Sequence, residues 1–254
     1  MILKLKLFIV ILLFFAPINL AYSSSVSTPT ESSLRAVALI GGYEIFGKLI
    51  ENLSYDERLL ILSIPHAVSY LALGQMPFDS TNISLTLSIV SATVLLGLDC
   101  WFDRFGNVNY PLALYSSALI DSLTFTNTQA LPWDVLKAVV IGFGEEAFFR
   151  GTIQPILRDC FNCTTTSTII TSALFAWIHR GNVYNFFQND RNSKDLRRLW
   201  LLALMPFYFV TGAYFSFLAE STQSILTGSI AHVFWNFLAY RIHRQLVKLP
   251  EAAQ

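Results

Sequence analysis

The chain has 254 residues, of which 54% are hydrophobic and only 13% are charged. Soluble domains carry about 25% charged residues, so the composition argues against a soluble domain and predicts a polytopic membrane protein. We expect an all-α fold, because open strands cannot satisfy their backbone groups in lipid. Equal numbers of basic and acidic residues, 17 each, give no reason to expect nucleic-acid binding.

The N-terminal 23 residues have the pattern of a targeting segment. Lys4 and Lys6 form a short basic region, a long apolar stretch follows, and Ala21 and Ser23 are small residues suited to a cleavage site. Segment 1–23 is therefore predicted to be a signal peptide or a signal anchor.

Nine apolar runs follow one another along the chain, each close to the length of about 20 residues that crosses a bilayer. The run at 35–50 is the weakest because it contains Glu44 and Lys48. We therefore predict a transmembrane helical bundle of about eight spanning helices, with 35–50 lying in the surface or re-entrant. The runs cover roughly 7–22, 35–50, 58–74, 83–102, 110–125, 133–153, 165–179, 199–218 and 224–240.

The sequence predicts N-terminal transmembrane helices over 24–130, a catalytic core over 131–240 and a basic tail over 241–254. Lys and Arg cluster at 191–198 and again at 241–248, and the predicted spans 199–218 and 224–240 separate the two clusters. Both clusters can thus face the cytoplasm, the side on which basic residues accumulate. We expect a multi-pass integral membrane protein in a lipid bilayer, with a polar chamber that opens toward the cytoplasm.

Charged and polar residues inside the late spans indicate where that chamber lies. Glu146 and Arg150 are spaced i,i+4, so they share a helix face and can pair. Glu145 points about 100° away around the same helix, which leaves its carboxylate without a partner in its own helix. His232 and Asn236 are also spaced i,i+4 and can face one cavity.

These residue types suit hydrolysis of an amide bond. A carboxylate in a dry site can take a proton from water and pass it on, and a neutral histidine beside it can orient that water. A second histidine with an asparagine amide can donate hydrogen bonds to a developing oxyanion. No serine or cysteine is placed to act as a nucleophile with these groups.

Three ordered motifs carry a family resemblance: "EEAFFRG" (145–151), "FAWIH" (175–179) and "HVFWN" (232–236). E-E-x-x-x-R, F-x-x-x-H and H-x-x-x-N, in this order, resemble the CPBP intramembrane endopeptidases, also called the type II CAAX prenyl endopeptidase-like or Abi family. The resemblance covers about 130–240, and the first 130 residues carry no motif.

The resemblance implies a role for each matching residue. Glu145 looks like the base that activates water with the help of His179, and His232 and Asn236 look like the oxyanion donors. Glu146 and Arg150 look like a supporting pair. The implied substrates are membrane-associated proteins or peptides, prenylated CAAX proteins among them, and the implied reaction needs no cofactor.

The resemblance leaves a second mechanism open, because Glu, His and His also match a catalytic zinc set. A zinc-dependent reaction would use Glu145 or Glu146 with His179 and His232. Two further functions also stay open: a transport protein whose polar groups form an ion path, and a non-catalytic scaffold or immunity protein. His66, beside Pro65, is interpreted as a packing or kink position.

Overall fold

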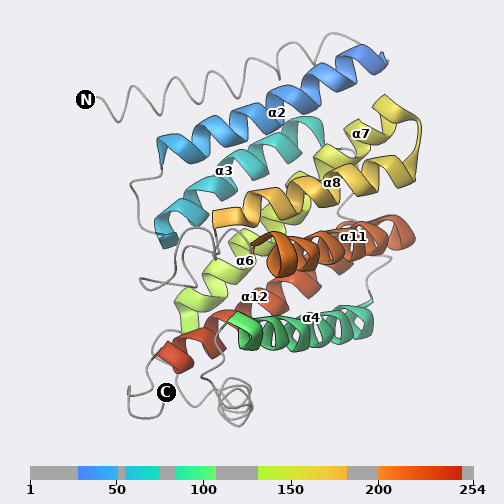
Figure 1. The fold of residues 1–254 in the computed structure, drawn as a ribbon. Coiled ribbons are helices and arrows are strands. Elements are labelled where there is room, and N and C mark those ends of the chain that lie inside the picture. The colour runs from blue at the N-terminus through green and yellow to red at the C-terminus, as the bar shows by residue number, and fades with distance from the viewer. Residues whose placement is uncertain (1–27, 51–54, 75–83, 107–130, 182–199, 248–254) are drawn as a thin grey trace.

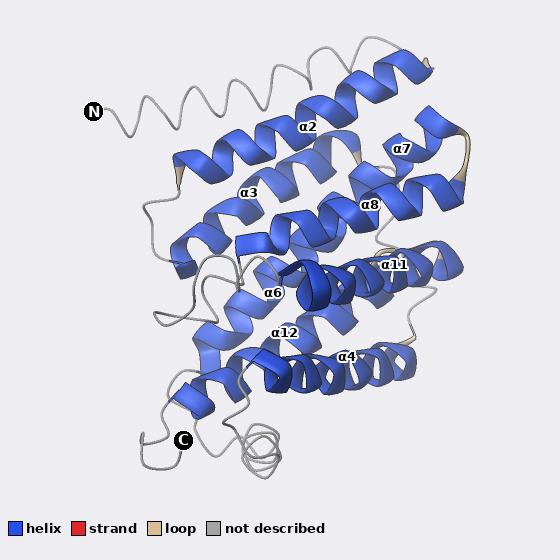
Figure 2. Ribbon diagram, viewed as in Figure 1, coloured by secondary structure: helices blue, strands red, loops and turns tan. Residues whose placement is uncertain are grey.

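The computed structural model describes residues 28–50, 55–74, 84–106, 131–181 and 200–247. Every regular element in these ranges is a helix and none is a strand (Figure 2). The predicted all-α class is confirmed for this part of the chain. The predicted targeting segment 1–23 and the apolar runs at 7–22 and 110–125 lie outside the described residues.

The helices follow the apolar runs closely, with differences of a few residues at their ends. The last helix is longer than its run: it continues to Val247, into the predicted basic tail, because no Gly or Pro interrupts the chain before Pro250. The α-helices are α2 (Pro29–Leu49), α3 (Tyr55–Leu73), α4 (Leu85–Gly106), α6 (Leu131–Phe148), α7 (Gln154–Phe161), α8 (Thr164–Ile178), α11 (Met205–Thr222) and α12 (Leu226–Val247).

Helix α2 starts six residues before its apolar run because a capping box fixes its first turn. The Thr28 side chain accepts from the Glu31 backbone N–H at 3.3 Å, and the Thr28 N–H donates to Glu31 Oε2 at 2.8 Å. Pro29 follows at the first helical position, where its missing N–H costs nothing. The start of this helix is therefore set by polar capping, which a search for apolar runs overlooks.

Two short π-helical segments interrupt what the sequence predicts as continuous helices. They cover Phe149–Ile153 and Trp200–Leu204, and the α-helix after each has a proline in its first two positions, Pro155 and Pro206. Proline lacks an N–H and its ring presses on the preceding turn. A local widening of the helix to π geometry accommodates that ring without breaking the helix.

Helix α6 lies at the centre of the bundle, packed between α3 and α12, and α4 covers the other side of α12 (Figure 1). Helix α8 packs on α7 and α11, and α2 packs on α7 and α3. A polar contact ties α2 to α7, since Ser33 Oγ lies 2.8 Å from Cys160 Sγ. The two late motifs on α8 and α12 are thereby brought to α6 from different sides.

None of the helices in the described ranges combines the length and the apolar character required of a membrane span. The bundle of about eight spans stays a prediction.

The bundle buries polar and charged side chains together with an apolar core, and it also exposes apolar side chains. Charged and polar groups are buried at its centre, including Glu146, Arg150 and His232, each at most 1% exposed. Large aliphatic side chains point outward from the outer helices, among them Val37 on α2 (68% exposed) and Val94 on α4 (56% exposed).

Candidate active site

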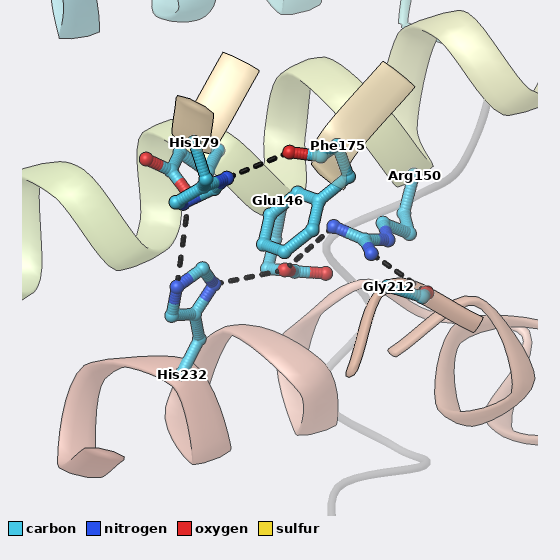
Figure 3. Close-up of polar contacts among 7 residues, drawn as sticks. Glu146, Arg150, Phe175, His179, Gly212 and His232 are labelled. Carbon is cyan, nitrogen blue, oxygen red and sulfur yellow. Dashed lines mark hydrogen bonds and ion pairs between the residues drawn. The ribbon is translucent and has the colours of Figure 1, made fainter. Parts of the chain in front are cut away.

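The predicted pair of Glu146, on α6, and Arg150, in the π-helical segment that follows α6, is present at the centre of the bundle. Arg150 Nη1 donates to Glu146 Oε1 at 3.0 Å, and both side chains are fully buried. Arg150 Nη2 donates to the backbone carbonyl of Gly212 on α11 at 2.7 Å (Figure 3). The guanidinium thus joins the π-helical segment after α6 to α11, and its charge is offset by a carboxylate and a carbonyl dipole.

Aromatic faces complete the surroundings of Arg150. Its Cζ atom lies 4.6 Å from the ring centroid of Phe175 and 5.4 Å from that of Phe215. Rings of this kind attract a cation through the negative face of their π-systems. The supporting pair is therefore held in an apolar cage that offers partners for its charge.

His232 comes from α12 and lies between the two glutamates of α6. Its Nδ1 is 2.9 Å from Glu146 Oε1, and its Nε2 is 3.7 Å from Glu145 Oε2. The ring stacks on Phe215 and Trp235, with centroid distances of 4.8 Å and 5.5 Å. The orientation of His232 is thus fixed on its edge by a hydrogen bond and on its faces by aromatic packing.

His179 comes from the end of α8, where the helix tightens into a 3₁₀ turn over His179–Gly181. Its Nδ1 is 2.7 Å from the carbonyl oxygen of Phe175, and its Nε2 is 3.6 Å from Glu145 Oε2. The ring also stacks on Tyr208 of α11 at 4.3 Å. His179 is therefore fixed with Nε2 facing Glu145.

The contacts of the two Nδ1 atoms determine which ring nitrogens carry protons. A carbonyl oxygen can only accept, so His179 Nδ1 donates to Phe175. The Glu146 carboxylate, which already accepts from Arg150, accepts from His232 Nδ1 in the same way. In their neutral forms both histidines therefore turn an Nε2 lone pair toward Glu145.

Glu145 is the point at which the three helices converge. Its Oε2 is buried, lies 3.6 Å and 3.7 Å from the two Nε2 atoms, and has no hydrogen-bond partner among the described residues. These distances exceed hydrogen-bond length by a few tenths of an ångström. Acceptors facing one another at this range suit a small hydrogen-bond donor between them, and a water molecule can donate to two of the three.

Asn236 is the one predicted site residue that the structure does not bring into this cluster. It lies on α12 one turn after His232, is partly exposed, and makes no hydrogen bond with the described residues. Its i,i+4 spacing still places it on the same side of α12 as His232. An oxyanion role for Asn236 therefore stays a prediction.

The zinc-dependent mechanism can be tested against the same geometry. In the described ranges, no group of three or more His, Cys, Asp or Glu side chains could hold a metal ion. Glu146 Oε1 is already shared by Arg150 and His232 Nδ1, which removes it as a ligand. The two Nδ1 contacts follow the pattern of metal-binding histidines, so a zinc-dependent mechanism with Glu145, His179 and His232 stays a prediction.

His66, which the sequence predicts to be a packing or kink residue, lies directly behind the site. It is 2% exposed, and its ring stacks between Tyr43 and Phe148 at centroid distances of 5.3 Å and 4.7 Å. Neither ring nitrogen has a partner among the described residues. No spacing signal links His66 to the motifs, since it is on α3, far from them in the sequence.

The structure brings the three motifs together in one site. The buried Glu–Glu–Arg segment lies beside two histidines that come from separate helices. Residues 127–238 match the family model described as type II CAAX prenyl endopeptidase Rce1-like. The match confirms the family resemblance predicted from the motifs, and over these residues the chain is similar to the Rce1-like endopeptidases. Neither the curated proteins nor the solved structures contain a match to this chain.

Proposed function

We propose that this protein is an intramembrane endopeptidase that hydrolyses peptide bonds in membrane-associated proteins or peptides, prenylated CAAX proteins among them. The observation that carries the proposal is the position of Glu145 Oε2, which is buried, faces two histidine Nε2 atoms and has no hydrogen-bond partner of its own among the described residues. The family match supports an endopeptidase over the same residues.

The first step in this mechanism is attack by water. Glu145 Oε2 acts as the general base and takes one proton, while His179 Nε2 accepts a hydrogen bond from the other hydrogen. The water oxygen then forms a bond to the carbonyl carbon of the substrate, which becomes tetrahedral. Glu145 passes its proton to the amide nitrogen as the C–N bond breaks, releasing a carboxylic acid and an amine.

The tetrahedral oxyanion requires N–H donors. His232 supplies one when its Nε2 carries a proton, and the Glu146 carboxylate on Nδ1 holds the ring in place. The Asn236 amide is the proposed second donor. In this scheme Glu146 and Arg150 hold His232 in place without touching the substrate.

The site works inside a membrane in this proposal. The motifs resemble those of intramembrane endopeptidases, and the outward-facing aliphatic side chains on α2 and α4 suit a lipid environment. The basic clusters at 191–198 and 241–248 favour a cytoplasmic position for the ends of the flanking helices. We therefore expect the polar chamber to open to the cytoplasmic side.

Cleavage by the protein purified in detergent tests the proposed function. The panel contains farnesylated CAAX peptides, the same peptides without the prenyl group, and unrelated membrane peptides. Wild type is compared with Glu145→Gln, with and without a chelator. Glu220→Gln is the matched control, because Glu220 pairs with Arg158 on α7 away from the site.

Cleavage by wild type and Glu220→Gln that is lost in Glu145→Gln and insensitive to the chelator would support the proposal. Cleavage that the chelator abolishes and zinc restores would replace it with the zinc-dependent mechanism, for which the contacts of both Nδ1 atoms are the favouring observation. Cleavage retained in Glu145→Gln would contradict both mechanisms.

A further inference from the structure

The turn that carries His179 is attached to the N-terminal helix α2 by an ion pair. Arg180 Nη1 donates to Glu44 Oε1 at 3.0 Å, and Arg180 Nη2 donates to Glu44 Oε2 at 2.6 Å. Two parallel N–H···O bonds of this kind fix the relative orientation of the guanidinium and the carboxylate as well as their distance. Glu44 and Arg180 are 136 positions apart in the sequence.

Trp177, in the last turn of α8, makes a hydrogen bond to each member of this ion pair. Its Nε1 donates to Glu44 Oε1 at 3.1 Å, and its backbone carbonyl accepts from Arg180 Nη1 at 3.0 Å. The Arg180 guanidinium also lies 4.6 Å from the centroid of the Trp177 ring. We call these three residues, Glu44, Trp177 and Arg180, the α2–α8 clamp.

His179 sits inside the segment that the clamp holds. Helix α8 ends at Ile178, and His179–Gly181 forms the 3₁₀ turn, so Trp177 and Arg180 flank the histidine on either side. The last carbonyls of a helix lack intrahelical donors, and such ends fray unless something else satisfies them. Here Arg180 satisfies the Trp177 carbonyl while Glu44 anchors Arg180.

The position of His179 is sensitive to small movements of this turn. Its Nε2 is 3.6 Å from Glu145 Oε2, and the proposed water must contact both atoms. A displacement of about 1 Å between catalytic groups can cost about 10²-fold in rate. The contact of Nδ1 with Phe175 lies within the same helix end, so it orients the ring but adds no tie between that end and α2 or α6.

We propose that Glu44 is a positioning residue for His179 and acts through Arg180 and Trp177. Helix α2, which lies outside the matched residues 127–238, then supplies a necessary part of the active-site framework. This inference rests on the proposed function for its catalytic consequence, and its structural consequence can be measured without any substrate. In the sequence alone, Glu44 is only a charge that weakens the predicted span 35–50.

Hydrogen exchange of the backbone tests the structural consequence. Glu44→Gln keeps the size of the side chain and removes its charge, so amides over 177–181 should exchange about 10-fold faster than in wild type. Glu220→Gln is the matched control, since Glu220 also accepts from an arginine and a second side chain, Arg158 and Gln154. Equal exchange over 177–181 in the two variants would overturn the proposal, whether or not a substrate is known.

Steady-state kinetics tests the catalytic consequence. We expect kcat to fall about 10-fold in Glu44→Gln with KM nearly unchanged, because the clamp moves a catalytic group and leaves substrate binding intact. Arg180→Gln should give a similar loss, and the double variant should lose no more than either single variant, since both act through one contact. Additive losses, or a change confined to KM, would contradict the proposal while leaving Glu145 as the base.

Discussion

Arg150 shows what a buried charge requires of its surroundings. Among the described residues it is the largest fully buried side chain, and it has a carboxylate, a backbone carbonyl and three aromatic rings as partners. Breaking a buried ion pair by removing one member leaves the other charge uncompensated. The pair Glu146–Arg150 is therefore expected to matter more for stability than the partly exposed pair Glu220–Arg158.

Replacing the two arginines in turn tests this difference. Arg150→Met should lower the free energy of unfolding by about 3–5 kcal/mol, because Glu146 keeps only His232 as a polar partner. Arg158→Met should lower it by less than about 1 kcal/mol, because that pair is partly solvated. Denaturant unfolding in detergent measures both values, and equal losses would show that the buried pair is not the stronger element.

His66 is a position at which a substitution is expected to raise the stability of the protein. Its ring is buried between Tyr43 and Phe148 with no partner for either nitrogen among the described residues. A buried polar group without a partner costs about 1–3 kcal/mol, so His66→Phe should keep the aromatic stack and raise the unfolding free energy by about 1 kcal/mol. Thermal unfolding checks the gain, and cleavage assays provide the control: lost activity in a well-folded His66→Phe protein would mean that a ring nitrogen is used.

At the scale of elements, the approach of α6 to α12 sets the spacing of the site. A Cβ atom added at Gly142 would lie 2.9 Å from the backbone nitrogen of Val233, next to His232. Only glycine permits this approach, which occurs one turn before Glu145 on α6. The distance between Glu145 and His232 therefore depends on a residue that takes no part in the chemistry.

Gly142→Ala should push α6 and α12 apart, lower the unfolding free energy by about 1–3 kcal/mol and reduce kcat. Gly97 on α4 is the matched control, since a Cβ there meets nothing within 4 Å. Gly97→Ala should instead stabilise the helix by about 0.5–1 kcal/mol. Paired measurements of unfolding and cleavage would contradict this account if the two substitutions behaved alike.

Local spacing predicted the parts of the fold and site that depend on a single helix. The i,i+4 positions of Glu146 and Arg150 were enough to predict their pairing, and the apolar runs predicted most helices to within a few residues. The π-helical turn at 149–153 was not predicted, because it reflects how the chain accommodates Pro155 at the start of α7. The apolar run at 133–153 predicts one continuous α-helix over this stretch.

Contacts between distant segments could not be predicted in this way. The pairing of Glu44 with Arg180 joins two helices 136 positions apart, and the stacking of His179 on Tyr208 follows no motif. Asn236 shows the converse, since its spacing from His232 is right and yet it contacts none of the cluster among the described residues. Spacing along one helix determines a face, whereas contacts between helices depend on packing.

At the scale of the whole molecule, the outward-facing aliphatic side chains and the buried charges lead to one expectation. The protein should stay with membranes after an alkaline carbonate wash and be released by detergent, because its exterior suits lipid. A reporter fused after Gln254 should read as cytoplasmic, as the basic cluster at 241–248 predicts. Release by the wash, or a non-cytoplasmic reporter, would contradict the proposed arrangement.

The central claim is that Glu145 is the base that activates water. The most direct measurement compares kcat of wild type with that of Glu145→Gln, which keeps the shape of the side chain and removes its basicity, alongside the thermal stability of both proteins. The account predicts a fall in kcat of about 10²-fold or more with little change in stability, because the Glu146–Arg150 pair is untouched. A variant that cleaves at the wild-type rate would contradict it.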